Sequence, residues 1–194
     1  MAHYPFQLPY LQNFVEFVYF SNVFLPHELA SIRKLWQDRQ SEKAALEGGA
    51  AFNDALRQSS VIGIDPGPEH DWIFERMTAA ILQCNSQFYH FDVHGIYEPL
   101  QLAQYGAGDF FDWHLDFGTG PSSNRKLSLT VQLSDPSTYE GGDLEFQINN
   151  KTVKAPREMG TVVIFPSFIM HRVTPITKGK RQSIVGWVSG PPYR

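Results

Sequence analysis

Hydrophobic residues recur at helical spacing in two stretches of the first half of the chain. The apolar positions that follow Asp71 are Ile73, Met77, Ile81, Cys84 and Phe88. This period predicts an amphipathic helix. A second helix is expected from Pro26, because proline suits the first helical turn and Leu29, Ile32 and Trp36 then fall on one face.

The segments around these helices are expected to be short and mixed. Residues 14–24, "FVEFVYFSNVF", alternate loosely and are rich in strand formers, and "VIGI" from Val61 is read as a short strand. Residues 41–60 are rich in alanine, glycine and polar side chains. We interpret them as a short helix with mobile flanks that could serve as a lid.

The pattern changes after Phe88 to short strand-like runs separated by Gly, Pro and Asn turns. These runs are "LQLAQY", "KLSLTVQLS", "DLEFQI", "KTVKA", "GTVVIFP", "HRVTPI" and "QSIVGWVS". Many short strands with regular turns predict a barrel or jelly roll. The expected fold class is therefore α+β with a mainly β core. We expect one domain over residues 1–194, in which a helical and mixed support region, 1–88, packs on a β-core, 89–194.

Composition narrows the class of partners. The chain has 194 residues, 42% of them hydrophobic, and a net charge of −4. An acidic balance argues against nucleic acid as a partner, because phosphate binding needs a basic surface. The single cysteine, the absence of a signal-peptide pattern at the first residues and the absence of a long apolar run predict a cytoplasmic protein without a membrane partner.

Two His-x-Asp pairs stand out, and the first of them is read as an ordinary polar face. In "FYHFDVHG", strand alternation would place His90, Asp92 and His94 on one side. On a straight strand His90 and His94 would lie about 13 Å apart. Metal–ligand bonds are only about 2 Å long, so these histidines could not share a metal.

The second pair, His114 and Asp116, lies in "GAGDFFDWHLDFGTG" between aromatic residues and glycines. A shared strand face would bring the two side chains together, and His171, which follows "GTVVIFPSFIM", could return from a distant strand. Two imidazoles and one carboxylate leave metal positions open and favour non-haem Fe(II) chemistry. A closed zinc site would need four ligands, usually including cysteine.

The run "GKRQSIVGWVSG" adds a possible anion-binding group. Arg181 and Ser183 share a strand face with Val185 and Trp187. An arginine that points inward needs an anionic partner, and a dicarboxylate cosubstrate would supply one. Arg181 could equally be a surface arginine between its lysine neighbours.

Together these motifs resemble the prolyl 4-hydroxylase-like 2-oxoglutarate/Fe(II) dioxygenases, especially their bacterial and phage PKHD-type branch. The pattern Tyr-x-x-Gly-x-x-(Tyr/Phe)-x-x-His-x-Asp is met by Tyr105, Gly108, Phe111, His114 and Asp116. The segments "LSDPSTYEGGDLEF" and "VVIFPSFIMHRVTPITKGKRQSIVGW" are similar to that branch as well. The resemblance covers residues 101–191. Phe111 stands where many relatives have tyrosine, so a hydroxyl is lost there.

The resemblance implies a double-stranded β-helix fold and a set of roles for these residues. It implies His114, Asp116 and His171 as iron ligands and Arg181 as the anchor for the distal carboxylate of 2-oxoglutarate. Ser183, Tyr105 and Gln132 are further candidates in the cosubstrate pocket. The implied cofactors are Fe(II), 2-oxoglutarate and O2, with ascorbate as a reductant.

Three functions remain open from the sequence. The first is hydroxylation of a peptidyl residue such as proline, with succinate and CO2 as co-products. The second is hydroxylation of a free amino acid or another small molecule, and the third is a non-catalytic jelly-roll binding module. The aromatic residues Trp113, Phe117 and Trp187 are expected to wall a dry pocket, and residues 117–124 to form a flexible rim.

Overall fold

The computed structural model describes residues 15–38, 42–43 and 55–193. Its helical segments are α1 (Pro26–Asp38), α2 (Asp71–Cys84), a π-helical extension (Asn85–Tyr89) and two 3-10 turns (Gly120–Asn124 and Pro136–Thr138). Two further segments of the first half, β1 (Val18–Phe20) and β4 (Ser60–Ile64), are strands, as expected from the alternation there.

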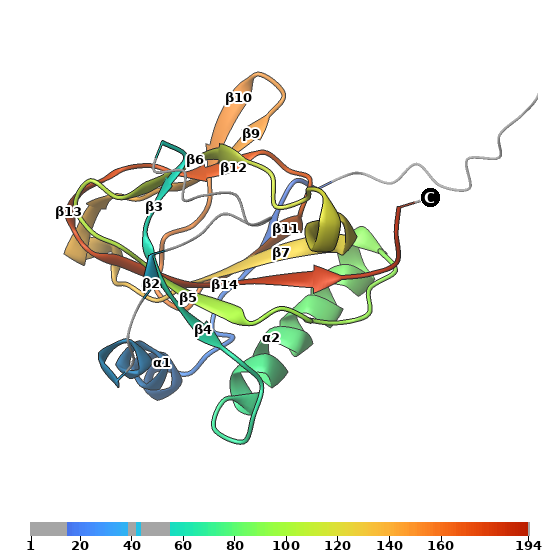
Figure 1. The fold of residues 1–194 in the computed structure, drawn as a ribbon, viewed down its shortest axis with the longest axis horizontal. Helices are drawn as coiled ribbons and strands as arrows, with labels where there is room; N and C mark the ends of the chain where they lie inside the picture. The colour runs from blue at the N-terminus through green and yellow to red at the C-terminus, as the bar shows by residue number, and fades with distance from the viewer. Residues whose placement is uncertain (1–14, 39–41, 44–54, 194) are drawn as a thin grey trace, which may run out of the picture.

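Two antiparallel sheets face each other, as Figure 1 shows. The seven-stranded major sheet has the order β1-β11-β7-β14-β5-β4-β2. Its other strands are β2 (Glu42–Lys43), β5 (Leu100–Tyr105), β7 (Arg125–Gln132), β11 (Val162–Pro166) and β14 (Arg181–Ser189). The arrangement is a double-stranded β-helix, as the sequence predicted.

The five-stranded minor sheet has the order β10-β9-β12-β6-β3. Its strands are β3 (Arg57–Gln58), β6 (Phe110–His114), β9 (Leu144–Ile148), β10 (Lys151–Lys154) and β12 (His171–Val173). A third, two-stranded sheet joins β8 (Tyr139–Gly141) to β13 (Ile176–Gly179). The β9–β10 hairpin projects from the body in both ribbon views.

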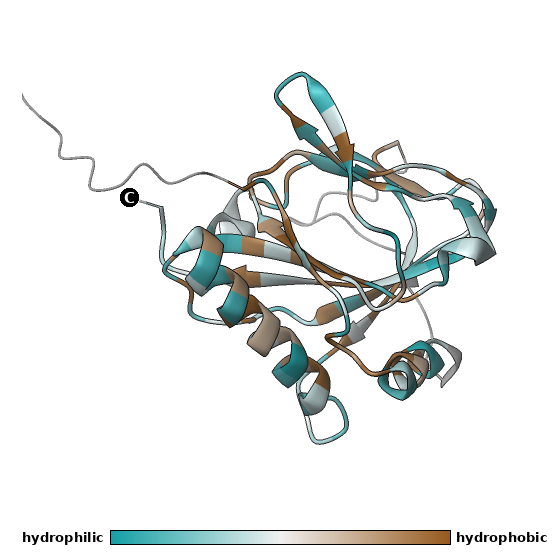
Figure 2. Ribbon diagram, turned by 180° about the vertical axis from the view of Figure 1, so that it is seen from behind, coloured by the Kyte–Doolittle hydropathy of each residue, from teal (hydrophilic) through white to brown (hydrophobic). Residues whose placement is uncertain are grey.

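The helices cover the outer face of the major sheet. Four of the five residues predicted from the period, Ile73, Met77, Ile81 and Cys84, are buried in α2 together with Ala80, and they pack with Leu127, Leu129 and Ile184 of the sheet. The fifth, Phe88, is partly buried in the π-helical extension. Figure 2 shows apolar segments on the strands of the major sheet that lie next to α2, and α2 itself alternates polar and apolar residues along its turns. This packing leaves the opposite face of the major sheet to face the minor sheet.

The expected short helix with mobile flanks over residues 41–60 differs from the structure at its flanks. Residues 42–43 and 57–58 are edge strands, and Arg57 and Gln58 pair with Phe111 and Phe110. The remainder of the proposed lid, residues 44–54, lies outside the described part of the chain. The edge strands are too short to show an alternation in the sequence.

The segment around His90 is not a straight strand. The π-helical extension continues α2, and the backbone of His90 then takes a left-handed conformation with φ of 53°. The side-chain amide of Asn85 fixes this exit, because it donates to the carbonyl of Phe91 and accepts from its N–H. His90, Asp92 and His94 are nevertheless exposed, as a polar face would be.

Candidate metal centre and cosubstrate cavity

His114 and His171 lie side by side on neighbouring strands of the minor sheet. His114 ends β6, His171 begins β12, and the two are directly paired in the antiparallel register. Asp116 lies beyond the end of β6 in a bend, where its N–H donates to the carbonyl of Ser167 at 3.0 Å. The shared strand face expected for His114 and Asp116 is thus replaced by a bend that turns the carboxylate back towards the imidazoles.

The three side chains converge on one point. Asp116 Oδ1 is 3.6 Å from His114 Nε2, and Asp116 Oδ2 is 3.5 Å from His171 Nε2. All three candidate ligand atoms lie within 4.8 Å of one another. The structure therefore brings together the three residues that the sequence singled out.

Hydrogen bonds and ring contacts orient both imidazoles. His114 Nδ1 lies 2.7 Å from the carbonyl of Asp112, and His171 Nδ1 lies 2.9 Å from the carbonyl of Ile169. A carbonyl only accepts, so each Nδ1 carries the proton and each Nε2 presents a lone pair. The Phe111 ring stacks on His114 at 3.5 Å, which is the contact that phenylalanine makes in place of the tyrosine of many relatives.

The electrostatics of the three groups suit a divalent cation. Burial alone would raise the pKa of Asp116, but His171, His114 and the Ser128 hydroxyl hold that pKa well below its usual range. Burial and the neighbouring His114 lower the pKa of His171 to about 4. An ionised carboxylate and an imidazole that stays neutral at physiological pH are the forms that bind metal. This donor set fits Fe(II), and the three residues leave the remaining coordination positions open.

Arg181 is buried at the start of β14 without an acidic partner among the described residues. Its guanidinium donates to Gln132 Oε1 at 3.0 Å and to Ser183 Oγ at 3.3 Å. Tyr105 is its register partner on β5 and lies with its ring centroid 5.6 Å from the guanidinium carbon. Burial lowers the pKa of Arg181. Arg181 Nε has no hydrogen-bond partner, so the buried guanidinium keeps a donor that a carboxylate ligand would satisfy.

Tyr139 belongs to the same pocket, although the sequence analysis did not identify it. Interaction with its side chain favours the charged form of Arg181 and so opposes the lowering of that pKa by burial, and the Arg157 guanidinium carbon lies 4.5 Å from the centroid of the Tyr139 ring. Gly142 makes room for this packing, since a Cβ there would come within 3.0 Å of Arg181 Cδ. In the sequence "TYEGGD" indicates only a turn, so no signal pointed to Tyr139.

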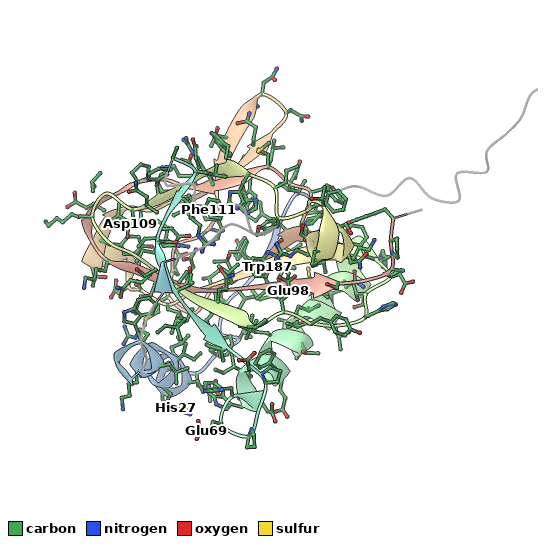
Figure 3. The ribbon with its side chains drawn as sticks, in the orientation of Figure 1. His27, Glu69, Glu98, Asp109, Phe111 and Trp187 are labelled. Carbon is green, nitrogen blue, oxygen red and sulfur yellow. The ribbon has the colours of Figure 1, made fainter. Side chains whose placement is uncertain are left out.

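A cavity of about 440 Å³ opens beside the metal-ligand candidates. Figure 3 labels Phe111 on the minor sheet and Trp187 on the major sheet, and both line this cavity. Phe117 lines it too, as predicted. Trp113 does not, because it lies on the other face of the minor sheet under Arg172. The assignment of Trp113 to the pocket wall was therefore wrong.

Two arginines that the sequence analysis missed line the same cavity. Arg125 pairs with the Glu98 carboxylate, with Nε 2.7 Å from Oε1, and its guanidinium lies 3.8 Å from the Trp187 ring centroid. Arg57 lies over Phe111 at 4.8 Å and donates to Gln101 Oε1 at 3.4 Å. Nothing in a single sequence distinguishes these arginines from surface arginines.

The C-terminal half of the chain matches a known family. Residues 100–189 match the profile of the "2OG-Fe(II) oxygenase superfamily". This match, over slightly less than half of the chain, shows that the second half is similar to that superfamily. The matched segment contains Tyr105, all three metal-ligand candidates and Arg181.

Curated proteins that are similar to this chain are PKHD-type hydroxylases. The chain is 40% identical over 96 residues to one from Hyphomonas neptunium, covering 47% of this chain and 43% of that protein. It is 32% identical over 126 residues to one from Synechococcus sp. (strain CC9605), covering 64% and 57%. The chain thus spans about half the length of the curated relatives it matches.

Solved oxygenase structures share the fold over most of the chain. A Pseudomonas putida prolyl-4-hydroxylase aligns with a TM-score of 0.71 at 22% identity, covering 91% of this chain and 93% of that one. A Trichoplax adhaerens prolyl hydroxylase, in complex with a hypoxia inducible factor peptide fragment, aligns with a TM-score of 0.76 at 18% identity, covering 90% and 84%. Within the residues described here, no helix is both long and apolar enough to cross a bilayer.

Proposed function

We propose that the protein is a 2-oxoglutarate- and Fe(II)-dependent dioxygenase that hydroxylates a C–H bond of a peptidyl residue such as proline. One O2 is consumed, the substrate gains a hydroxyl group, and 2-oxoglutarate leaves as succinate and CO2. The observation that carries the proposal is the joint presence of the His114–Asp116–His171 cluster and a buried Arg181 that pairs with no carboxylate of the described residues. A non-catalytic module would need neither.

The residues of the metal centre hold and shield the ion. His114, Asp116 and His171 would bind Fe(II), which supplies the activation of O2 and the oxidation of the C–H bond when bound. Phe111, stacked on His114, and Phe165, whose ring centroid is 4.7 Å from that of His171, pack against the imidazole rings and restrict their orientation. The carbonyls of Asp112 and Ile169 hold the proton on Nδ1, so that both Nε2 atoms remain available.

The cosubstrate would bind by its distal carboxylate. Arg181 would donate to that carboxylate, while Gln132 and Ser183 keep the guanidinium in place. Tyr105 and Tyr139 close the pocket around the charge. Because 2-oxoglutarate carries a carboxylate at each end, the other end remains available to reach the metal.

A peptide substrate is favoured by the surface around the cavity. Leu115 lies between His114 and Asp116, lines the cavity and is 42% exposed. An exposed apolar side chain at the edge of a cavity is typical of a surface that binds another chain. Arg57 supports the alternative, a free amino acid or another small molecule, since a guanidinium in the cavity could anchor a free carboxylate.

The proposal is tested by substrate-stimulated turnover. Fe(II)-loaded protein is supplied with 2-oxoglutarate, ascorbate and O2, and succinate is measured with proline-rich peptides or with free L-proline. We expect peptide to stimulate succinate formation and to gain the mass of one oxygen atom. Stimulation by free L-proline alone would establish the small-molecule alternative. No succinate under any condition, with metal bound, would contradict the proposed activity. The need for ascorbate and the cytoplasmic location stay predictions.

A further inference from the structure

A row of side chains crosses four strands on the outer face of the minor sheet. Lys154 on β10 lies with Nζ 3.9 Å from Glu145 Oε1 on β9. Glu145 Oε2 accepts from Arg172 Nε at 2.8 Å, and the Arg172 guanidinium lies 4.5 Å from the ring centroid of Trp113 on β6. We call Trp113, Arg172 and Glu145 the outer clamp.

The outer clamp lies directly behind the metal-ligand candidates. In the strand register Arg172 is opposite Glu145, and His171 is opposite Phe146 on one side and His114 on the other. Side chains alternate between the two faces of a sheet. His171 and Arg172 therefore emerge from one strand on opposite faces, and the clamp spans the same strands that carry both histidines.

The backbone pairing between these strands is irregular at this place. His171 pairs with His114, but Val173 pairs with Phe111, so Asp112 and Trp113 together oppose Arg172. This is a β-bulge, a feature that interrupts the ladder and re-aims a side chain. The N–H of Asp112 donates to Leu56 instead, and the carbonyl of Asp112 accepts from His114 Nδ1.

We propose that Arg172 is a positioning residue for the metal centre. By stacking on Trp113 and pairing with Glu145, it fixes the conformation of the bulge, and the bulge sets the separation and orientation of His114 and His171. This inference rests on the proposed function, because it assumes that these histidines bind the metal. Arg172 contacts neither metal nor substrate.

The chemistry of the clamp requires the guanidinium and not merely a positive charge. Arg172 Nε and one terminal nitrogen both lie 2.8 Å from Glu145 Oε2. The same planar group stacks on the indole, which an ammonium on a flexible stem does less well. The Glu145 side chain is 8% exposed, so removal of its partner would leave a buried carboxylate. A variant that removes the Arg172 guanidinium must therefore also replace the Glu145 carboxylate by a neutral group.

The test measures metal binding and not turnover. The variants are Arg172→Lys and the double variant Arg172→Met with Glu145→Gln, and Lys178→Met serves as the control. Lys178 also pairs with a carboxylate across strands, at 3.4 Å from Glu140, but its side chain is 76% exposed and belongs to β13. Co(II) affinity, the Co(II) visible spectrum and the melting temperature of the metal-free protein are recorded for each.

Loss of a direct hydrogen-bond partner of a metal-ligating histidine commonly weakens metal binding about 10- to 100-fold, and the bulge places one such partner, the carbonyl of Asp112, against His114 Nδ1. We expect such a loss, with shifted Co(II) bands, in the double variant, a smaller loss in Arg172→Lys and wild-type behaviour in Lys178→Met. Unchanged Co(II) affinity and bands in the double variant, whatever its melting temperature, would overturn the inference. If the wild-type protein itself bound no Co(II) or Fe(II), the proposed function would fail instead, so the two failures are distinguishable.

Discussion

Replacement of Arg181 by methionine distinguishes two roles of this residue, binding of 2-oxoglutarate and stabilisation of the fold. The guanidinium is 1% exposed, is held by neutral groups on Gln132 and Ser183, and has no carboxylate partner in the described part of the chain. A buried cation costs several kcal/mol to desolvate, and hydrogen bonds to neutral side chains offset only part of this cost. We expect the variant Arg181→Met to keep its fold and to lose its affinity for 2-oxoglutarate.

The expected magnitudes follow from these contacts. Methionine removes the desolvation cost, whereas the vacated Gln132 oxygen loses a donor, a loss of about 1–3 kcal/mol. These effects oppose each other, so the free energy of unfolding of the metal-free protein should change by less than about 2 kcal/mol. Two charge-assisted hydrogen bonds to the cosubstrate carboxylate contribute about 3–4 kcal/mol, so its dissociation constant should rise about 100- to 1000-fold.

The assay is anaerobic calorimetric titration of Fe(II)-loaded protein with 2-oxoglutarate and with 2-oxobutyrate, which lacks the distal carboxylate. Lys180→Met is the matched control, because it removes a neighbouring exposed cation with the same change in net charge. Wild type and Lys180→Met should prefer 2-oxoglutarate strongly, and Arg181→Met should bind both acids with similar weak affinity. An unchanged preference in Arg181→Met would refute the assignment and move the anchor to another cation.

Three further predictions follow from single contacts. The folded-state pKa of His171 is about 4, below its ordinary value of 6.5, so the unfolded chain binds the proton more readily. The metal-free protein should therefore lose about 3 kcal/mol as pH falls from 6.5 to 4, and urea titration of His171→Ala should show a flatter pH dependence. Gly141→Ala should destabilise by more than about 2 kcal/mol in urea titration, because its Cβ would lie 2.0 Å from the Pro175 carbonyl oxygen at a positive φ, whereas Gly67→Ala, with open space around it, should not. Arg57→Ala should raise the KM of a peptide substrate without changing the 2-oxoglutarate dissociation constant; the opposite pattern would place Arg57 in the cosubstrate pocket.

The regular elements could be predicted because their patterns are local. The helical period predicted four of the buried residues of α2. The short strand-like runs of the second half correspond to strands of the sheets. Segments that depend on long-range pairing could not be predicted. The edge strand at Arg57 exists because it pairs with β6, and its two residues carry no pattern of their own.

The candidate site was predictable as a set of residues but not as a geometry. His114, Asp116, His171 and Arg181 were found through spacing and resemblance, and the structure brings the first three together. The bulge at Asp112 and Trp113 left no trace in the sequence, although strand alternation alone already placed Trp113 on the face away from His114.

Cavity-lining cations were missed for a different reason. Arg125 and Arg57 acquire their positions from the Trp187 and Phe111 rings on which they lie, and these partners are distant in sequence. A single sequence shows where an arginine occurs but not which face of a later strand it will meet. The same limit applies to Tyr139, which reaches Arg181 from another sheet.

The proposed iron and 2-oxoglutarate site is tested by titrating 2-oxoglutarate into Fe(II)-loaded protein without O2 and recording the visible charge-transfer band of a chelated 2-oxo acid. His171→Ala is compared with His94→Ala, which removes an exposed imidazole from outside the cavity. We expect a saturable band in wild type and His94→Ala and no band in His171→Ala. A folded, metal-loaded wild-type protein without a band, or a band that survives in His171→Ala, would contradict the proposed iron and cosubstrate site.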